Sequence, residues 1–276
     1  MNSSSAGSLA VTRLAASENT ARNLVMLHGI YGRGRNWHGI ARALVTARPD
    51  YACWMVDLPH HGDSGPGTHG DTIGGLAADV AQWLAVNAIV PNAVLGHSYG
   101  GKVALALSAR IPGTRMQIWV IDSTPETKLP SGSAWGLLDI IRGLPPRFAT
   151  RDEATHAIMG AGYPLGVAQW MGTNLVRDGS AFAWRLDFDA MERLLRDFFG
   201  TDLWNVVEHP SSGHDIHILK ASESNAISPD AVARITAAAG SHLHLHLRDG
   251  GHWIHAESPE VVVGLLCEHL PHTIGG

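Results

Sequence analysis

The pentapeptide at positions 96–100 reads G-H-S-Y-G and carries the clearest chemical pattern in the chain. An apolar, strand-like run precedes it and a helix-compatible stretch follows it, which places Ser98 on a turn between a strand and a helix. The glycines permit a sharp turn that lifts the hydroxyl off the strand end, and the start of the helix aims backbone N–H groups at a developing anion. We therefore expect Ser98 to be a nucleophile. The alternative is a glycine-rich turn with an incidental serine.

A base for Ser98 must come from one of 17 histidines. Only His252 combines a flexible lead-in of two glycines, a position after the last apolar strand, and the chain order serine, acid, histidine. A histidine on such a loop can swing over the nucleophile at the carboxyl edge of the sheet. We expect His252 to be the general base, and a structural histidine is the alternative.

Backbone N–H groups are expected to stabilise the negative charge that forms when the nucleophile attacks. The segment H-G-I-Y-G at 28–32 follows an earlier apolar strand, where enzymes with this type of serine turn supply a second donor. We expect the N–H groups of Ile30 and Tyr99 to form the oxyanion hole, each contributing on the order of 3 kcal/mol to transition-state stabilisation. His28 is expected to anchor the loop rather than to take part in the reaction.

Two carboxylates compete for the role of the acid that orients His252. Many enzymes with this serine turn carry an aspartate in a G-x-x-D turn after the penultimate strand, but here that turn reads A-S-E-S and ends in Ser224. A serine cannot stabilise an imidazolium as a carboxylate does. Asp122 closes the strand M-Q-I-W-V-I-D at the same sheet edge as Ser98, so we expect Asp122 to be the acid and Glu223 to be the second choice. The alternative for Asp122 is a cap on the turn that follows.

The elements that position these residues alternate between strand and helix. Apolar runs at VTRLA, NLVMLHG, YACWMVDLP, NAVLGHS and MQIWVID predict strands, and 37–47, 72–89 and 99–109 predict helices. The pattern returns with HILKAS, PDAVARITAAAG, SHLHLHLRDG and a closing helix at 259–269. We expect an α/β fold with a mostly parallel sheet and helices on both of its faces.

The segment 123–210 interrupts this alternation. It shows no convincing strand, only helix-compatible stretches such as AWGLLDIIRGL and FDAMERLLRDFFG, broken by Pro and Gly. We expect a core domain made of 1–122 and 211–276 and an inserted helical cap at 123–210. The four tryptophans of this segment are expected to form the core of the cap and the wall of a pocket, with a surface for another protein as the alternative.

The motifs HGIYG, VDLPHHGDS, GHSYGGKVAL, VIDSTP and GHWIHAESPE resemble the α/β-hydrolase superfamily across the whole sheet domain. More narrowly, G-H-S-x-G-G-K-V with I-D-x-x-P and G-H-W-x-H-A is similar to small capped carboxylesterases and thioesterases. This resemblance implies a serine hydrolase that cleaves short acyl esters or thioesters through an acyl-enzyme. It also implies that the acid ends the subgroup's sixth strand, which maps onto Asp122. The chain departs from the subgroup after strand seven, where A-S-E replaces glycines and an asparagine.

Other reactions use the same three residues. The resemblance leaves open perhydrolysis without a cofactor, hydrolysis of carbon–carbon bonds, lyase chemistry and acyl transfer, as well as a ligand receptor without turnover. No cofactor is implied. The alternation of His242, His244 and His246 makes a metal site conceivable, but no carboxylate or cysteine stands at ligand spacing within that strand, so we expect no metal.

Composition restricts the partners. Lys and Arg total 20 against 25 Asp and Glu, without charge runs, so we expect neither nucleic acid nor an anionic membrane as a partner, and small neutral molecules fit better. The resemblance implies that this small molecule is an ester. The start of the sequence lacks a basic and apolar leader, and no run of 18 apolar residues occurs. Cys53 and Cys267 lie in apolar patterns, which suits buried thiols in a reducing compartment. We expect a cytoplasmic protein.

Overall fold

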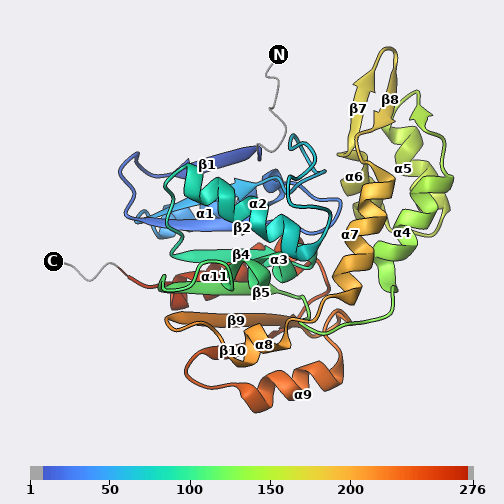
Figure 1. Cartoon of the computed structure of the whole chain (residues 1–276). Helices are drawn as coiled ribbons and strands as arrows, with labels where there is room; N and C mark the ends of the chain where they lie inside the picture. Colours follow the sequence, from blue (N-terminus) through green and yellow to red (C-terminus); the bar gives the residue numbers. More distant parts are fainter. Residues whose placement is uncertain (1–8, 273–276) are drawn as a thin grey trace.

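The computed structural model describes residues 9–272 and is built around one central sheet (Figure 1). Its seven strands lie in the order β1-β3-β2-β4-β5-β9-β10. They are β1 (Val11–Ala15), β2 (Arg22–Leu27), β3 (Tyr51–Val56), β4 (Ala93–His97), β5 (Met116–Ile121), β9 (His214–Ala221) and β10 (Leu243–Arg248). All neighbours pair in parallel except β1, which runs antiparallel to β3. The mostly parallel sheet is therefore as predicted.

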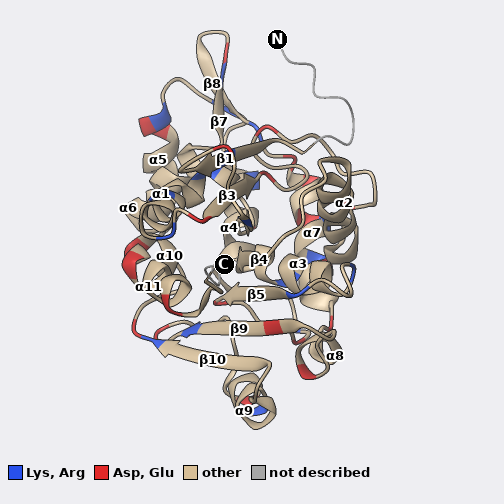
Figure 2. Ribbon diagram, turned by 90° about the vertical axis from the view of Figure 1, so that its left-hand side faces the viewer, with Lys and Arg blue, Asp and Glu red and all other residues tan. Residues whose placement is uncertain are grey.

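Helices cover both faces of this sheet, as Figure 2 shows in a view along the sheet. The helices are α1 (His38–Ala47), α2 (Ile73–Val86), α3 (Tyr99–Ser108), α8 (Trp204–Glu208), α9 (Pro229–Ala238), α10 (Ile254–Glu257) and α11 (Pro259–His269), and a short 3-10 helix, η1 (Gly34–Trp37), precedes α1. Side chains alternate along β2: Val25 and Leu27 pack with α2 and α3, whereas Leu24 and Met26 pack with α1 and α11. This two-sided burial explains why the strands read as continuous apolar runs.

The segment between β5 and β9 contributes a second group of elements beside the main sheet (Figure 1). Besides α8, its helices are α4 (Gly132–Gly143), α5 (Arg151–Gly160), α6 (Leu165–Gly172) and α7 (Phe188–Gly200). It also contains a small antiparallel sheet of β6 (Arg147–Phe148), β7 (Leu175–Asp178) and β8 (Ala181–Trp184), in the order β6-β8-β7.

The expectation that this segment holds no strand is thus wrong. β7 and β8 form a hairpin with the two-residue loop Gly179–Ser180, and Gly179 has a positive φ of 63°. A glycine adopts this conformation without the steric cost that a side chain would add. The strands are only two to four residues long, too short for their alternation to stand out in the sequence.

The charged residues do not gather on one part of the ribbon: segments with Lys or Arg and segments with Asp or Glu are scattered over it (Figure 2). Across residues 9–272, no helix combines the length and the apolar character that a membrane crossing requires.

Candidate active site

Ser98 stands on the turn between β4 and α3 in a strained backbone conformation. Its φ of 51° and ψ of −117° lie in a region that residues with a side chain seldom adopt. The two motif glycines make the turn possible, because a Cβ on Gly96 would lie 2.0 Å from the backbone oxygen of Gly100, and one on Gly100 would lie 2.5 Å from the backbone oxygen of His28. The turn therefore needs both glycines, and it exposes the Ser98 hydroxyl at the carboxyl edge of the sheet.

Strand register brings Asp122 next to Ser98. His97 at the end of β4 pairs with Ile121 at the end of β5, so the residues that follow them leave the sheet at the same level. The N–H of Ser98 donates to the carbonyl of Ile121 over 3.0 Å, and the N–H of Asp122 donates to Leu219 on the next strand over 2.8 Å. Asp122 also has a positive φ, 47°. Asp122 directly follows β5, the strand predicted from the run M-Q-I-W-V-I-D.

The side chains of Ser98, His252 and Asp122 form one continuous chain of polar contacts. Nδ1 of His252 lies 2.7 Å from Oδ2 of Asp122, and Nε2 of His252 lies 3.1 Å from Oγ of Ser98. Since an ionised carboxylate only accepts hydrogen bonds, Nδ1 carries the proton. Nε2 of the neutral ring is then free to accept the Ser98 proton.

Glu223, the second candidate acid, lies apart from this chain. Its side chain is exposed and makes no hydrogen bond to His252 in the part of the chain that the structure describes, although its backbone N–H donates to Gly250 over 2.9 Å. Ser224, one residue further on, is buried, and its hydroxyl donates to Oδ2 of Asp122. The sequence analysis noted Ser224 only because it stands where the G-x-x-D turn carries an aspartate, and assigned it no role.

The backbone N–H groups of Ile30 and Tyr99 have no hydrogen-bond acceptor within residues 9–272. Tyr99 opens α3, and the first N–H groups of a helix lack acceptors within that helix. Ile30 lies on the loop after β2, which is held in place by two buried histidines. His28 accepts from the N–H of Leu58 over 3.0 Å, and His61 accepts from the N–H of Tyr31 over 3.2 Å.

Two further histidines, His97 and His255, lie near His252, and the sequence analysis did not single them out. Nε2 of His97 donates to the backbone oxygen of His252 over 2.8 Å, and the two rings lie 4.7 Å apart. The ring of His255 lies 3.9 Å from that of His97. Burial lowers the pKa of His97 well below its ordinary value and that of His255 to about 3. Both rings therefore stay neutral at pH 7.

A cavity of about 380 Å³ opens over Ser98. Its walls are mainly apolar and come from the loop after β2, from α4 and α6, and from the loop after β10; they include Ile30, Leu137, Tyr163, Val167, Trp170 and Trp253. Ser98 and His252 both line it. A pocket of this size and polarity suits a small molecule with an apolar part.

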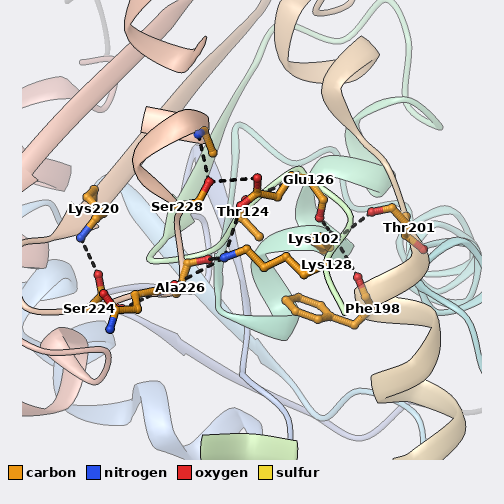
Figure 3. Close-up of polar contacts among 12 residues, drawn as sticks. Lys102, Thr124, Glu126, Lys128, Phe198, Thr201, Lys220, Ser224, Ala226 and Ser228 are labelled. Atoms are coloured by element: carbon orange, nitrogen blue, oxygen red, sulfur yellow. Dashed lines mark hydrogen bonds and ion pairs between the residues drawn. The ribbon is translucent and has the colours of Figure 1, made fainter. Parts of the chain in front are cut away.

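Lys102, one turn after Ser98 in α3, is fully buried and connects this helix to the segment that carries α4 to α7. Its ammonium donates to the backbone oxygens of Glu126, Phe198 and Thr201 over 2.8, 2.6 and 2.7 Å (Figure 3). Burial lowers its pKa to about 8, so it is still charged at pH 7 and all three donors are used. Helix α3 thus holds both ends of that segment.

The three histidines at and just before β10 contact different partners. His242 contacts Asp215 over 2.8 Å, whereas His244 and His246 stack on the buried His217 of β9, at ring distances of 4.5 and 5.3 Å. Over residues 9–272, no group of three or more His, Cys, Asp or Glu side chains is arranged to hold a metal ion.

Comparison with known proteins assigns the family. The model of the alpha/beta hydrolase family matches residues 24–265. The chain belongs to this family. The match spans the main sheet except β1, the segment with α4 to α7, and the loops that carry Ser98, Asp122 and His252.

Relatives and solved structures agree with this assignment. The chain is 25% identical over 252 residues to the sn-1-specific diacylglycerol lipase ABHD11 of Mus musculus, covering 90% of this chain and 80% of the relative. It is 24% identical over 264 residues to the esterase YbfF of Escherichia coli, covering 94% and 97%. A marine microorganism esterase has the same fold, with a TM-score of 0.81 and 22% identity over 95% of this chain and 99% of that structure. These similarities support the prediction of a serine ester hydrolase.

Proposed function

We propose that this alpha/beta hydrolase cleaves carboxylic esters of short acyl chains, thioesters included, through a Ser98–His252–Asp122 triad and an acyl-enzyme. The observation that carries the proposal is the contact chain from Oγ of Ser98 through the His252 ring to the buried carboxylate of Asp122. Relatives named lipase and esterase support an ester as the substrate.

In the proposed reaction, Nε2 of His252 takes the proton of Ser98 while Oγ attacks the ester carbonyl carbon. The imidazolium that forms is stabilised by Asp122, which also keeps the proton on Nδ1. The charge on the carbonyl oxygen is stabilised by the N–H groups of Ile30 and Tyr99, whose lack of other acceptors in the described chain supports this role. His252 then gives its proton to the leaving alcohol or thiol.

Hydrolysis of the acyl-enzyme repeats these steps with water as the nucleophile. His252 takes a proton from the water, the hydroxide attacks the acyl carbon, and the bond to Oγ of Ser98 breaks as the proton returns to the serine. The product is a carboxylic acid, and the enzyme regains its starting state.

We also propose that 123–210 forms a cap that limits the acyl chain, on a core domain of 1–122 and 211–276. The apolar walls that α4 and α6 give to the cavity support this role, as does the attachment of both segment ends to Lys102. Since Cys53 and Cys267 are both free thiols, we further propose a cytoplasmic location.

The variant Ser98→Ala tests the proposed reaction. It removes the nucleophile without removing core volume, so it should unfold at the wild-type temperature and lose about 10⁶-fold in kcat on a short-chain p-nitrophenyl ester. The same substrate, followed in the pre-steady state, should give a burst and then steady release with the wild type. A Ser98→Ala variant that keeps a tenth of the activity contradicts the proposal, and binding without any release by the wild type favours a receptor.

A further inference from the structure

We propose that Ser224 is a positioning residue of the triad, whose hydroxyl holds the Asp122 carboxylate against His252. The inference rests on the proposed function, because it assumes that Asp122 is the acid. It assigns a role to the residue at which many enzymes with this serine turn carry the acid itself.

The Asp122 carboxylate is fully buried and depends on hydrogen-bond donors around it. Oδ1 accepts from the N–H of Ala221 over 3.1 Å, whereas Oδ2 accepts from both His252 and the Ser224 hydroxyl. A buried ionised carboxylate is costly unless donors satisfy its oxygens. Two of these three donors belong to the turn 221–224, so this turn decides which way the carboxylate faces.

The position of the Ser224 hydroxyl is itself fixed. Its oxygen accepts from the N–H of Ala226 over 3.1 Å, and its single proton therefore points the other way, toward Asp122. The backbone oxygen of Ser224 accepts from Nζ of Lys220 over 2.7 Å (Figure 3). The N–H of Ser224 donates to the backbone oxygen of Ala221 over 3.1 Å. Ser224 thus makes three hydrogen bonds in addition to the one to the Asp122 carboxylate, and these fix its position.

This geometry requires a donor at position 224 rather than a carboxylate. Asp122 occupies the acid site from the neighbouring strand, and a second anion in contact with Oδ2 would repel it. A serine instead supplies a hydrogen-bond donor, which stabilises the Asp122 anion and leaves the side of the carboxylate that faces His252 free. A serine in place of the aspartate at position 224 therefore fits an acid that is carried after β5.

The test compares Ser224→Ala, which removes the donor, with Ser224→Thr, which keeps it. We expect Ser224→Ala to lower kcat about tenfold on a short-chain p-nitrophenyl ester with KM within twofold of the wild type, because the ester does not contact position 224. Ser224→Thr should keep at least half of the wild-type kcat. Ser222→Ala is the matched control, since Ser222 is exposed on the same turn, and it should behave as the wild type.

The kcat values of the Ser224 variants decide whether the hydroxyl positions the acid. If Ser224→Ala and Ser224→Thr lose kcat equally, or if Ser224→Ala keeps kcat within twofold, the hydroxyl does not position the acid and the inference is wrong. Ser224→Asp adds a test of sign: it should fall below Ser224→Ala in kcat because it replaces the donor by an anion. An Ser224→Asp variant as active as the wild type would also overturn the inference.

The rate at which a fluorophosphonate labels Ser98 makes the two proposals separable, because labelling needs an activated serine but no ester turnover. A wild type that is labelled yet hydrolyses no ester contradicts the proposed function alone. In that case a tenfold slower labelling of Ser224→Ala, with normal labelling of Ser222→Ala, still supports the role of Ser224, and equal labelling rates contradict it.

Discussion

The side-chain amide of Asn174 donates a hydrogen bond of 2.8 Å to the backbone oxygen of Tyr31, in a fully buried contact between the segment that carries α4 to α7 and the loop after β2. Tyr31 directly follows the oxyanion candidate Ile30 and has a positive φ of 61°. Its hydroxyl donates to the backbone oxygen of Ala134 over 2.8 Å. The loop proposed to stabilise the oxyanion is therefore held partly by this segment.

Replacing Asn174 by Ala should loosen this loop. The Tyr31 oxygen would be left buried without a donor, which costs about 1 to 3 kcal/mol in the free energy of unfolding. Misplacing the Ile30 N–H should lower kcat about tenfold, less than the 10² to 10³ that loss of a whole oxyanion donor costs. Urea unfolding and steady-state kinetics measure the two effects. Thr173→Ala, at the exposed neighbouring residue, is the control, and an Asn174→Ala variant with wild-type kcat would contradict the link.

The two candidate acids should respond very differently to replacement by an amide. Asp122→Asn keeps the shape but loses the charge and the control over the His252 tautomer, and such a change lowers kcat on the order of 10⁴-fold in serine proteases. Glu223→Gln should lose less than about tenfold, because an exposed glutamate acts on His252 only through a field screened by solvent and salt. The kcat values of Asp122→Asn and Glu223→Gln, measured on the same ester, show which carboxylate is the acid. A large loss in Glu223→Gln with an active Asp122→Asn would assign the acid to the turn after β9.

Preference for acyl-chain length should reflect the limited cavity over Ser98. We expect kcat/KM to peak at roughly two to six acyl carbons, because each buried methylene contributes about 0.8 kcal/mol until the pocket is full. Trp170→Ala removes a wall of the cavity and should move the peak to longer chains, whereas Trp83→Ala, in α2 and away from the cavity, should leave it in place. Assays across a series of p-nitrophenyl esters measure the profile. A steady rise to long-chain substrates in the wild type would contradict a limiting cap.

The sequence predicts those structural features that depend on residues close together in the chain. The Ser98 turn, the strands of the main sheet and the closing helix Pro259–His269 follow from short motifs and continuous apolar runs. The hairpin β7–β8 was missed because its strands have four residues each, although the loop dipeptide Gly179-Ser180 is a hairpin signal. Apolar alternation over so few residues does not distinguish a strand from an irregular segment.

The surroundings of the site could not be predicted from the sequence, because they depend on contacts between distant segments. Ser224 meets Asp122 only through the pairing of β5 with β9, and 102 residues separate the two positions. His97 meets the loop of His252 over a separation of 155 residues. No local pattern marks either pair. The motif GHSYGGKVAL contains Lys102, but the three backbone oxygens that its ammonium contacts lie far away in the sequence, so only the structure reveals them.

The stability of the fold should fall in mild acid, because several buried histidines are held neutral. Burial lowers the pKa of His28 to about 4 and those of His61 and His217 to about 3, from an ordinary value of 6.5. Between these values and pH 6.5, the unfolded chain binds more protons than the folded chain, so the free energy of unfolding rises with pH. The stabilisation is complete above about pH 6.5 and is lost progressively as the pH falls toward 3.

His217 allows this prediction to be tested away from the proposed triad. Its ring stacks on Trp119 at 4.1 Å, and its Nδ1 lies 3.0 Å from Nε2 of His246, an arrangement in which two charged rings would repel each other. Each such histidine contributes a slope of about 1.4 kcal/mol per pH unit within its window. His217→Gln does not titrate, so urea unfolding between pH 4 and pH 6.5 should show a slope smaller by about that amount. Ser241→Gln, at an exposed position just before β10 that carries no titratable group, is the control and should keep the wild-type slope. An unchanged slope in His217→Gln would mean that the His217 ring binds protons equally in the folded and the unfolded chain over this range, and it would contradict the prediction.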